Sequence, residues 1–255
     1  MLRALCLAMV AVALPMASAS ADAPPDLDSN AALKYWQAFS ALPKFTDAEQ
    51  TKIHEYLTAP LDDHARGIVT RAEYALTMLH QGAAQRRCEW GVSPEEGIYV
   101  RFPQAAASRV LAALACLRAR IRFEQGKGAQ AVDDIVAVVT LGRHTSLTGT
   151  NIMLLVGYAI EHRAIETLAH DLAKLDAGLI KGLTTRLDAL PAGMNTATAT
   201  ETEETFYLDW FIRRAQEAKD KETLVMALDF INIEPEGKPR GSVNKARAFI
   251  EECGG

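Results

Sequence analysis

The chain has 255 residues, a formal net charge of −5, and 49% hydrophobic against 23% charged side chains. This composition is typical of a globular protein that is long enough to bury a sizeable core. The acidic balance, with Lys and Arg scattered along the chain, disfavours nucleic-acid binding, which depends on clustered positive charge. After the N-terminal segment, no stretch has the roughly 20 apolar residues that a membrane-spanning helix needs.

The first residues have the pattern of an export signal. Arg3 precedes an apolar run over residues 4–14, and the small residues at 19–21 fit a cleavage site, with 17–19 as a second candidate. We therefore expect residues 1–21 to be a signal peptide. The mature protein would then be exported, periplasmic or secreted, without stable membrane insertion.

The cysteines do not define a disulfide framework. Cleavage after residue 21 leaves Cys88, Cys116 and Cys253, and an odd number of thiols cannot pair completely within one chain. Cys116 lies roughly 18 Å along the second of two successive helices, too far from Cys88 for the Cα separation of about 7 Å that a disulfide allows. A bond between Cys88 and Cys253 stays open.

Nearly the whole chain has helical periodicity, with apolar residues at intervals of three and four. A capping box at Thr46–Glu49 and a break at Gly126–Gly128 separate successive segments. The predicted helices cover residues 29–42, 46–57, 62–88, 103–125, 129–145, 151–175, 177–190, 200–220 and 221–231. We expect an all-α fold of antiparallel hairpins over residues 22–231, followed by a linker and a C-terminal helix over 232–255.

One hairpin has the spacing of a tetratricopeptide unit. Within Arg118–Val139, the small residues Ala119 and Ala131 allow two helices to approach, and Gly126 provides the turn. A strict 34-residue period is not found elsewhere in the sequence. The expected architecture is therefore a tetratricopeptide-like α-solenoid with degenerate repeats, or an irregular helical bundle.

Several segments along the chain have a recognisable combination of motifs. They are "NAALKYWQAF" at 30–39, "CEWG" at 88–91, "RVLAALACLRARIRFEQGKGAQAVDD" at 109–134, "LGRH" at 141–144 and "LVGYAIE" at 155–161. Together they resemble uncharacterised exported helical proteins of planctomycete-type bacteria. The resemblance covers most of the mature chain and implies the helical fold and the compartment. It implies no activity.

Charged residues within apolar faces are the strongest candidates for a site. On a helical wheel, Glu161 falls within an apolar cluster formed by Leu154, Ile165, Leu168 and Leu172. A carboxylate buried there without a partner would be costly, so it is expected to be neutral or paired.

A second set of charges supplies partners for this acid. Glu203 and Arg214 project from an aromatic face that includes Trp210, while Arg118 and Arg122 lie four residues apart on a core helix. As a functional site, the two acids would act as acid–base or ligand-binding groups and Arg118 would hold an anion. As a structural network, they would fix the register of the helices. The structural alternative is favoured.

A strip of potential metal ligands lies on one predicted helix. His162, Glu166 and His170 recur every four residues and so share one side of that helix. The same wheel places this strip on the polar side of the helix, so a solvated face is the favoured interpretation. No metal and no cofactor are expected.

The segment "RRCEWGVSPEEGIYVRFP", residues 86–103, is long for a connection between helices. Trp90 can close the end of a helix pair, and the adjacent Glu95 and Glu96 point to opposite sides of an extended chain. A packed cap is favoured over a rim for a ligand or partner.

The favoured function is a non-enzymatic interaction or scaffold module of the cell envelope, with a protein partner bound on a concave helical surface. Its binding candidates are Arg118, Arg122, Arg214, Trp90 and Trp210. The alternative is a small-molecule or glycan-acting enzyme or binder that uses a buried Glu and Arg pocket. A scaffold predicts paired interior acids and an exposed groove lined by aliphatic and aromatic side chains, whereas an enzyme predicts a closed concave pocket in which at least one acid of raised pKa faces solvent.

Overall fold

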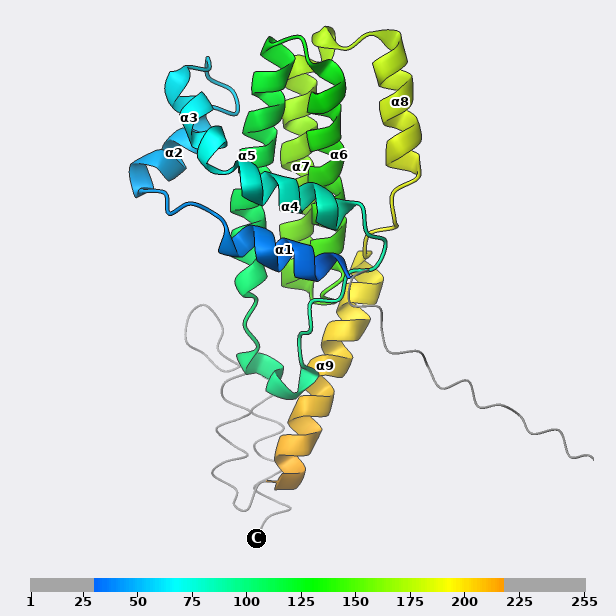
Figure 1. Ribbon diagram of the computed structural model, residues 1–255. Coiled ribbons are helices and arrows are strands. Elements are labelled where there is room, and N and C mark those ends of the chain that lie inside the picture. Colours follow the sequence, from blue (N-terminus) through cyan, green and yellow to red (C-terminus); the bar gives the residue numbers. More distant parts are fainter. Residues whose placement is uncertain (1–29, 218–255) are drawn as a thin grey trace, which may run out of the picture.

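The computed structural model describes residues 30–217, which are helical apart from short connections (Figure 1). The α-helices are α1 (Ala31–Ser40), α2 (Asp47–Glu55), α3 (Asp63–Arg71), α4 (Glu73–Ala83), α5 (Pro103–Glu124), α6 (Gly128–Ser146), α7 (Asn151–Asp171), α8 (Ala177–Asp188) and α9 (Thr196–Glu217). Two 3-10 segments, η2 (Pro94–Tyr99) and η3 (Leu172–Lys174), complete the set. No β-strand occurs within these residues, so the predicted all-α class is confirmed.

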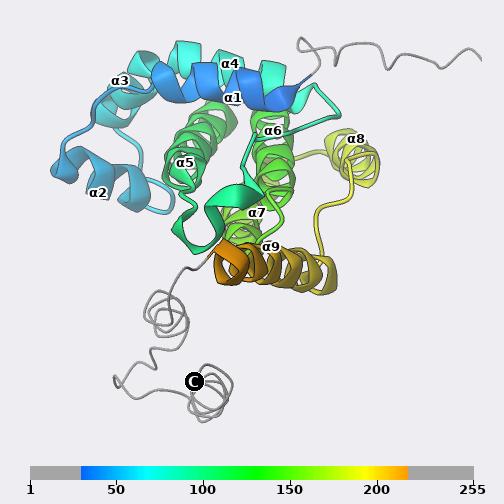
Figure 2. The same cartoon turned by 90° about the horizontal axis from the view of Figure 1, so that it is seen from below.

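Three long helices, α5, α6 and α7, form the centre of the fold. Figure 2 shows them end-on, with α1 and α4 across one side and α7 on the side away from α1 and α4. Helix α8 packs beside α6, while α9 contacts the start of α7 and the 3-10 segment η2. None of the described helices is long and apolar enough to cross a membrane.

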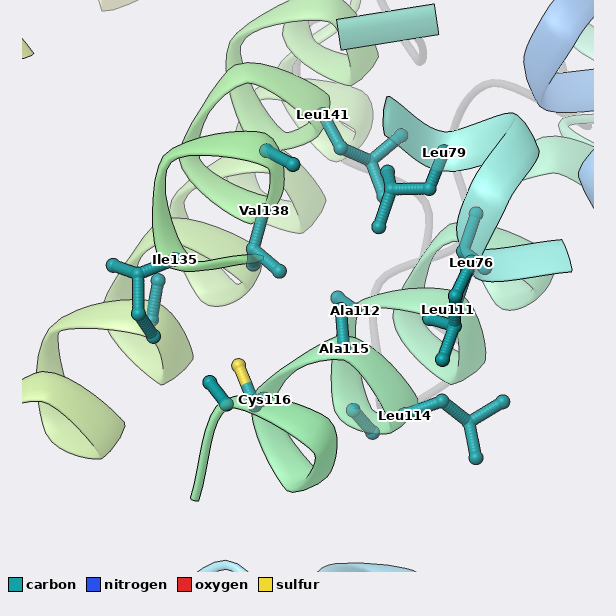
Figure 3. Packing of buried hydrophobic residues seen from close by; sticks show 14 of the residues in the cluster. Leu76, Leu79, Leu111, Ala112, Leu114, Ala115, Cys116, Ile135, Val138 and Leu141 are labelled. Carbon is teal, nitrogen blue, oxygen red and sulfur yellow. The ribbon is translucent and has the colours of Figure 1, made fainter. Parts of the chain in front are cut away.

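The α5–α6 hairpin has the predicted construction. Gly126 adopts a φ of +71°, a left-handed conformation that glycine accepts without strain, and the chain reverses there. Ala119 and Ala131 are fully buried, as close helix contact requires. Leu76 and Leu79 of α4 point towards the side chains of α5 and α6 and close this part of the core (Figure 3).

Helices α6 and α7 share the most extensive interface of the described elements, and two glycines make it close. A Cβ atom on Gly157 would lie 2.6 Å from the carbonyl oxygen of Gly142, and one on Gly142 would lie 2.9 Å from the carbonyl oxygen of Gly157. Because both positions lack a side chain, the two backbones approach more closely than a Cβ atom at either position would allow.

The helices predicted over 62–88 and 200–220 have other bounds in the structure, and the first ends at Ala83 rather than at residue 88. The single helix expected over 62–88 is divided at Ala72, because α3 packs on α5 whereas α4 packs mainly along α1. Ala72 itself is fully buried, so tertiary contacts rather than a Pro or Gly decide the break. Helix α9 begins at Thr196 rather than at 200, so the Thr-rich segment is helical.

Other sequence predictions are not tested. The tetratricopeptide repeat stays a prediction, since the described hairpin is one unit. The predicted signal peptide over 1–21, the helix over 221–231 and the segment 232–255 lie outside the described residues.

Candidate functional site

A buried carboxylate on α6 is the centre of a charge network that joins three helices. Asp134 is fully buried and accepts hydrogen bonds from Arg118 Nη2 at 2.6 Å and from Arg122 Nη1 at 2.7 Å. His80 Nε2 of α4 lies 2.7 Å from the same carboxylate, and Glu73 of α4 pairs with Arg118 at 2.7 Å. Both oxygens of the buried Asp134 carboxylate therefore have an arginine partner, which the burial of a charge requires.

A spacing in the sequence indicates the Arg118–Asp134 pair, which was not among the predicted contacts. Arg118 and Asp134 each lie eight residues from Gly126, on opposite sides of the turn. Residues at equal distances from the turn of an antiparallel hairpin lie at the same height, so this spacing points to the contact.

Glu161 does not contact the predicted partners Arg118 and Arg122. Its carboxylate lies 3.9 Å from Arg143 Nε on α6, and its side chain retains 25% of its exposure. Burial raises the pKa of Glu161, and Arg143 opposes that shift. The side chain packs against Gly142, at the edge of the α6–α7 interface rather than within its core. The predicted network of Glu161 with the α5 arginines is therefore wrong.

Glu203 of α9 lies apart from these groups and contacts the first residue of α7. Asn151 donates a hydrogen bond from its side-chain amide to the Glu203 carboxylate. Burial raises the pKa of Tyr207, and Glu203 raises it further. Arg214 lies on α9, and its side chain is outside the described structure. Glu161 and Glu203 therefore belong to two separate local contacts.

A second buried charge pair joins α5 to the end of α7. Arg120 and Asp171 are both nearly inaccessible, and Arg120 Nε lies 3.7 Å from the Asp171 carboxylate. Arg120 Nη1 donates hydrogen bonds to the carbonyl oxygens of Tyr56 and Ala59, which follow α2. Lys174 Nζ reaches Asp171 at 2.7 Å. These contacts hold α2 and η3 against the central helices.

The predicted cap around Trp90 is confirmed. Trp90 is buried and its ring stacks on Tyr35 and Phe39 of α1 at centroid distances of 5.6 and 6.1 Å. Its indole N–H donates a hydrogen bond of 2.7 Å to the carbonyl oxygen of His144. Tyr35 completes the cluster through its hydroxyl, which lies 2.8 Å from His144 Nδ1. The loop therefore fastens α1 to the end of α6.

His144 is a structural group within this cap. It is fully buried, and burial lowers the pKa of the imidazole to about 4. Its Nε2 atom has no hydrogen-bond partner among the described residues. A neutral imidazole is required there, since a charged one would be buried without a counter-ion.

Trp210 contacts the other end of the same connection. Its ring packs over Gly97 of η2 and meets the ring of Tyr99 edge-on at 5.9 Å. The two predicted binding tryptophans therefore lie at opposite ends of the loop, where each is buried against other aromatic or backbone groups.

The predicted strip on α7 is exposed to solvent. The His162 and Glu166 side chains are 71% and 65% exposed and lie 3.2 Å apart, and His170 contacts Asp171 instead. Within residues 30–217 no group of three or more potential ligands is placed to hold a metal ion.

Cys88 and Cys116 are free thiols and both are buried. Burial raises the pKa of each to about 12, so neither forms a reactive thiolate at neutral pH.

The outer face of α7 and of the η3 turn that follows it carries large apolar side chains that no described residue covers. They are Leu155 at 65% exposure, Ile165 at 59%, Ile152 at 57%, Leu172 at 48% and Tyr158 at 46%. The helix buries a different face, which includes Met153, Val156 and Ile160. The predicted apolar face was therefore wrong at Ile165 and Leu172. Because α7 is apolar on two sides, a helical wheel cannot identify the buried side.

An open groove of about 540 Å³ lies between α1 and α4. Its lining is formed by Leu33, Trp36, Gln37, Ser40, Ala41 and Tyr74. None of the predicted acids or arginines reaches it.

Comparison of the chain with protein-family models, with curated proteins and with solved structures gave no match. The resemblance to exported planctomycete-type proteins therefore stays a prediction.

Proposed function

We propose that the protein is a non-enzymatic interaction module of the cell envelope, and that the outer face of α7 is its docking surface. The observation that carries this proposal is the row of five large apolar side chains exposed along α7 and η3. Exposed apolar side chains that form a continuous surface are characteristic of interaction sites, whereas isolated ones are ordinary. The envelope location rests on the signal pattern of residues 1–21.

The arrangement of the charges supports this function over the enzymatic alternative. Asp134 is compensated by Arg118 and Arg122, and Glu161 and Glu203 lie in separate contacts. An acid–base site needs its groups to converge on one substrate position. The groove between α1 and α4 is lined by uncharged residues, so it does not supply such a position. The tetratricopeptide-like hairpin is consistent with a scaffold role.

Thiol labelling at position 165 tests the docking surface. An Ile165→Cys variant in a Cys253→Ser background carries one accessible thiol among the described residues, because Cys88 and Cys116 are buried. Tyr74→Cys is the matched control, since Tyr74 is 62% exposed but lies on α4. The maleimide reaction rate is measured for purified protein at about 1 µM and for the envelope fraction of the producing cells.

The proposal predicts that the thiol of the Ile165→Cys variant reacts rapidly in the purified protein and at least about tenfold more slowly in the envelope fraction. The thiol of the Tyr74→Cys control is expected to react at similar rates in both. Equal rates for the Ile165→Cys variant in the two samples would contradict a docking role. Slow reaction in the purified, dilute protein would also contradict it, because residues 218–255 or another part of the same chain would then cover the face.

A further inference from the structure

We infer that the occupant of the α7 face is a second copy of this chain, with the two α7 helices packed antiparallel. This inference rests on the proposed docking function of the same face. It is carried by the spacing of the exposed residues and by the charges beside them.

Four of the five large apolar side chains of this face, together with His162 and Ala169, follow a heptad pattern. The intervals between them alternate three and four along Leu155, Tyr158, His162, Ile165, Ala169 and Leu172, and every one of these positions is exposed. Such a pattern forms a straight apolar seam on a helix, and a seam of this kind packs against another helix with the same spacing. The face is therefore suited to a helix, and a second α7 provides one.

Side-chain size favours the antiparallel arrangement. A two-fold axis between His162 and Ile165 would place Leu155 opposite Leu172 of the second copy. The same axis places Tyr158 opposite Ala169, so a large ring meets a small side chain. In a parallel pair each residue would meet its own copy, and Tyr158 would face Tyr158 while Ala169 faced Ala169.

Charge complementarity favours the same orientation. Glu161 and Glu166 are five residues apart and flank the seam on opposite sides. In a parallel pair this spacing brings Glu161 of one copy to Glu166 of the other, twice, and like charges at these positions oppose association. In the antiparallel pair Glu166 lies on the same side of the seam as Arg163 of the second copy, whose guanidinium lies 2.9 Å from His54 Nδ1 in its own chain. Two opposite-charge neighbours then replace two like-charge ones.

His162 supplies a polar group at the centre of the seam. Its imidazole is 71% exposed and lies 3.2 Å from Glu166 on the same helix, which provides a partner when the seam is covered. A polar residue at one core position of a helix pair restricts its register. His162 would therefore help to fix the alignment about the two-fold axis.

Sedimentation velocity of the purified protein tests the inference. A single helix pair buries less surface than a standard stable interface, so we expect a dissociation constant on the order of tens of micromolar. The measurement runs from about 2 to about 200 µM, for wild type, Ile165→Glu, Glu166→Lys and the control Tyr74→Glu. All three substituted residues are well exposed, so the fold is expected to be retained.

The expected result is a dimer that grows with concentration for wild type and Tyr74→Glu, and at least about tenfold weaker association for Ile165→Glu. Glu166→Lys is expected to weaken the dimer about three- to tenfold, because a lysine would face Arg163. In a parallel dimer the same change would strengthen association, and that outcome would overturn the antiparallel inference.

A wild-type protein that stays monomeric throughout would overturn the second copy as occupant. The proposed docking function fails separately, by equal labelling of the Ile165→Cys variant in purified and envelope samples.

Discussion

Asp134 on α6 accepts hydrogen bonds from Arg118 on α5 through both carboxylate oxygens, from Nη2 to Oδ1 at 2.6 Å and from Nε to Oδ1 and Oδ2 at 3.2 Å. The Asp134 side chain is fully buried, and its second oxygen accepts from Arg122 at 2.7 Å. A buried carboxylate with this many directed partners sets the register of the α5–α6 hairpin as well as balancing its charge.

Replacing Asp134 by asparagine is expected to lower the free energy of unfolding by about 3–5 kcal/mol, because Arg118 and Arg122 lose their buried counter-charge. The adjacent Asp133 is a matched control, since its side chain is 48% exposed and pairs with Arg186 at the surface. Asp133→Asn is expected to cost less than about 1 kcal/mol. Urea denaturation measures both, and equal effects would contradict the role of Asp134.

The burial of His144 predicts that the folded protein loses stability in acid. Burial lowers its pKa from 6.5 to about 4 in the folded protein, so the unfolded chain binds the proton first as the pH falls. The neutral imidazole of His144 therefore contributes about 3 kcal/mol to the free energy of unfolding above about pH 6.5, and this contribution is lost as the pH falls towards 4.

His144→Gln is expected to remove this part of the pH dependence, whereas His162→Gln, at an exposed position, keeps it. Denaturation midpoints between about pH 4 and 7 measure the difference. The same slope in His144→Gln as in wild type would be inconsistent with a neutral, buried imidazole.

Gly157→Ala is expected to destabilise the protein by about 1–3 kcal/mol, although alanine has the higher helix propensity. The new Cβ would lie 2.6 Å from the Gly142 carbonyl oxygen, so α6 and α7 must separate. A Cβ atom on Gly182 of α8 would meet nothing within 4 Å, so Gly182→Ala is expected to raise the free energy of unfolding by about 0.5–1 kcal/mol. Thermal unfolding compares the two variants, and a higher stability of both would refute the close contact between α6 and α7.

Glu161→Gln is expected to change the stability at neutral pH by less than about 1 kcal/mol, because Arg143 is a distant partner at 3.9 Å. Burial raises the pKa of Glu161, so the wild type loses stability as the pH rises through the titration of this carboxyl, and the glutamine variant does not. Glu166→Gln on the exposed face is the control, and urea denaturation across this pH range compares the variants. Loss of the folded state at neutral pH in Glu161→Gln alone would show that this acid is structurally essential.

Local signals in the sequence predicted most of the helices. The Thr46–Glu49 capping box and the Gly126 turn occur as expected, because each depends on groups within a few residues of one another. The cap at Trp90 was also predicted, from an aromatic residue in a long connection. The partners of Trp90, Tyr35 and His144, are distant in the sequence and have no local signal.

The charges and exposed faces were harder to predict because they depend on tertiary packing. The helical wheel of α7 could not separate its two apolar faces, so Ile165 was expected to be buried and is 59% exposed. Arg118 was expected to pair with Glu161 or Glu203, whereas its partner Asp134 lies at the mirrored position of the same hairpin. The break at Ala72 has no local cause, since it follows from the different packing of α3 and α4.

A distance between identical residues in two copies measures the α7 arrangement most directly. Ala173 is exposed beside the seam, and a spin label on Ala173→Cys in a Cys253→Ser background leaves the buried Cys88 and Cys116 unmodified. In the antiparallel dimer the two labelled positions are about nineteen residues apart along the helix axis, which corresponds to a distance of about 30 Å. A distance of about 10 Å would indicate parallel helices, and no intermolecular coupling at high concentration would show that α7 does not pair with itself.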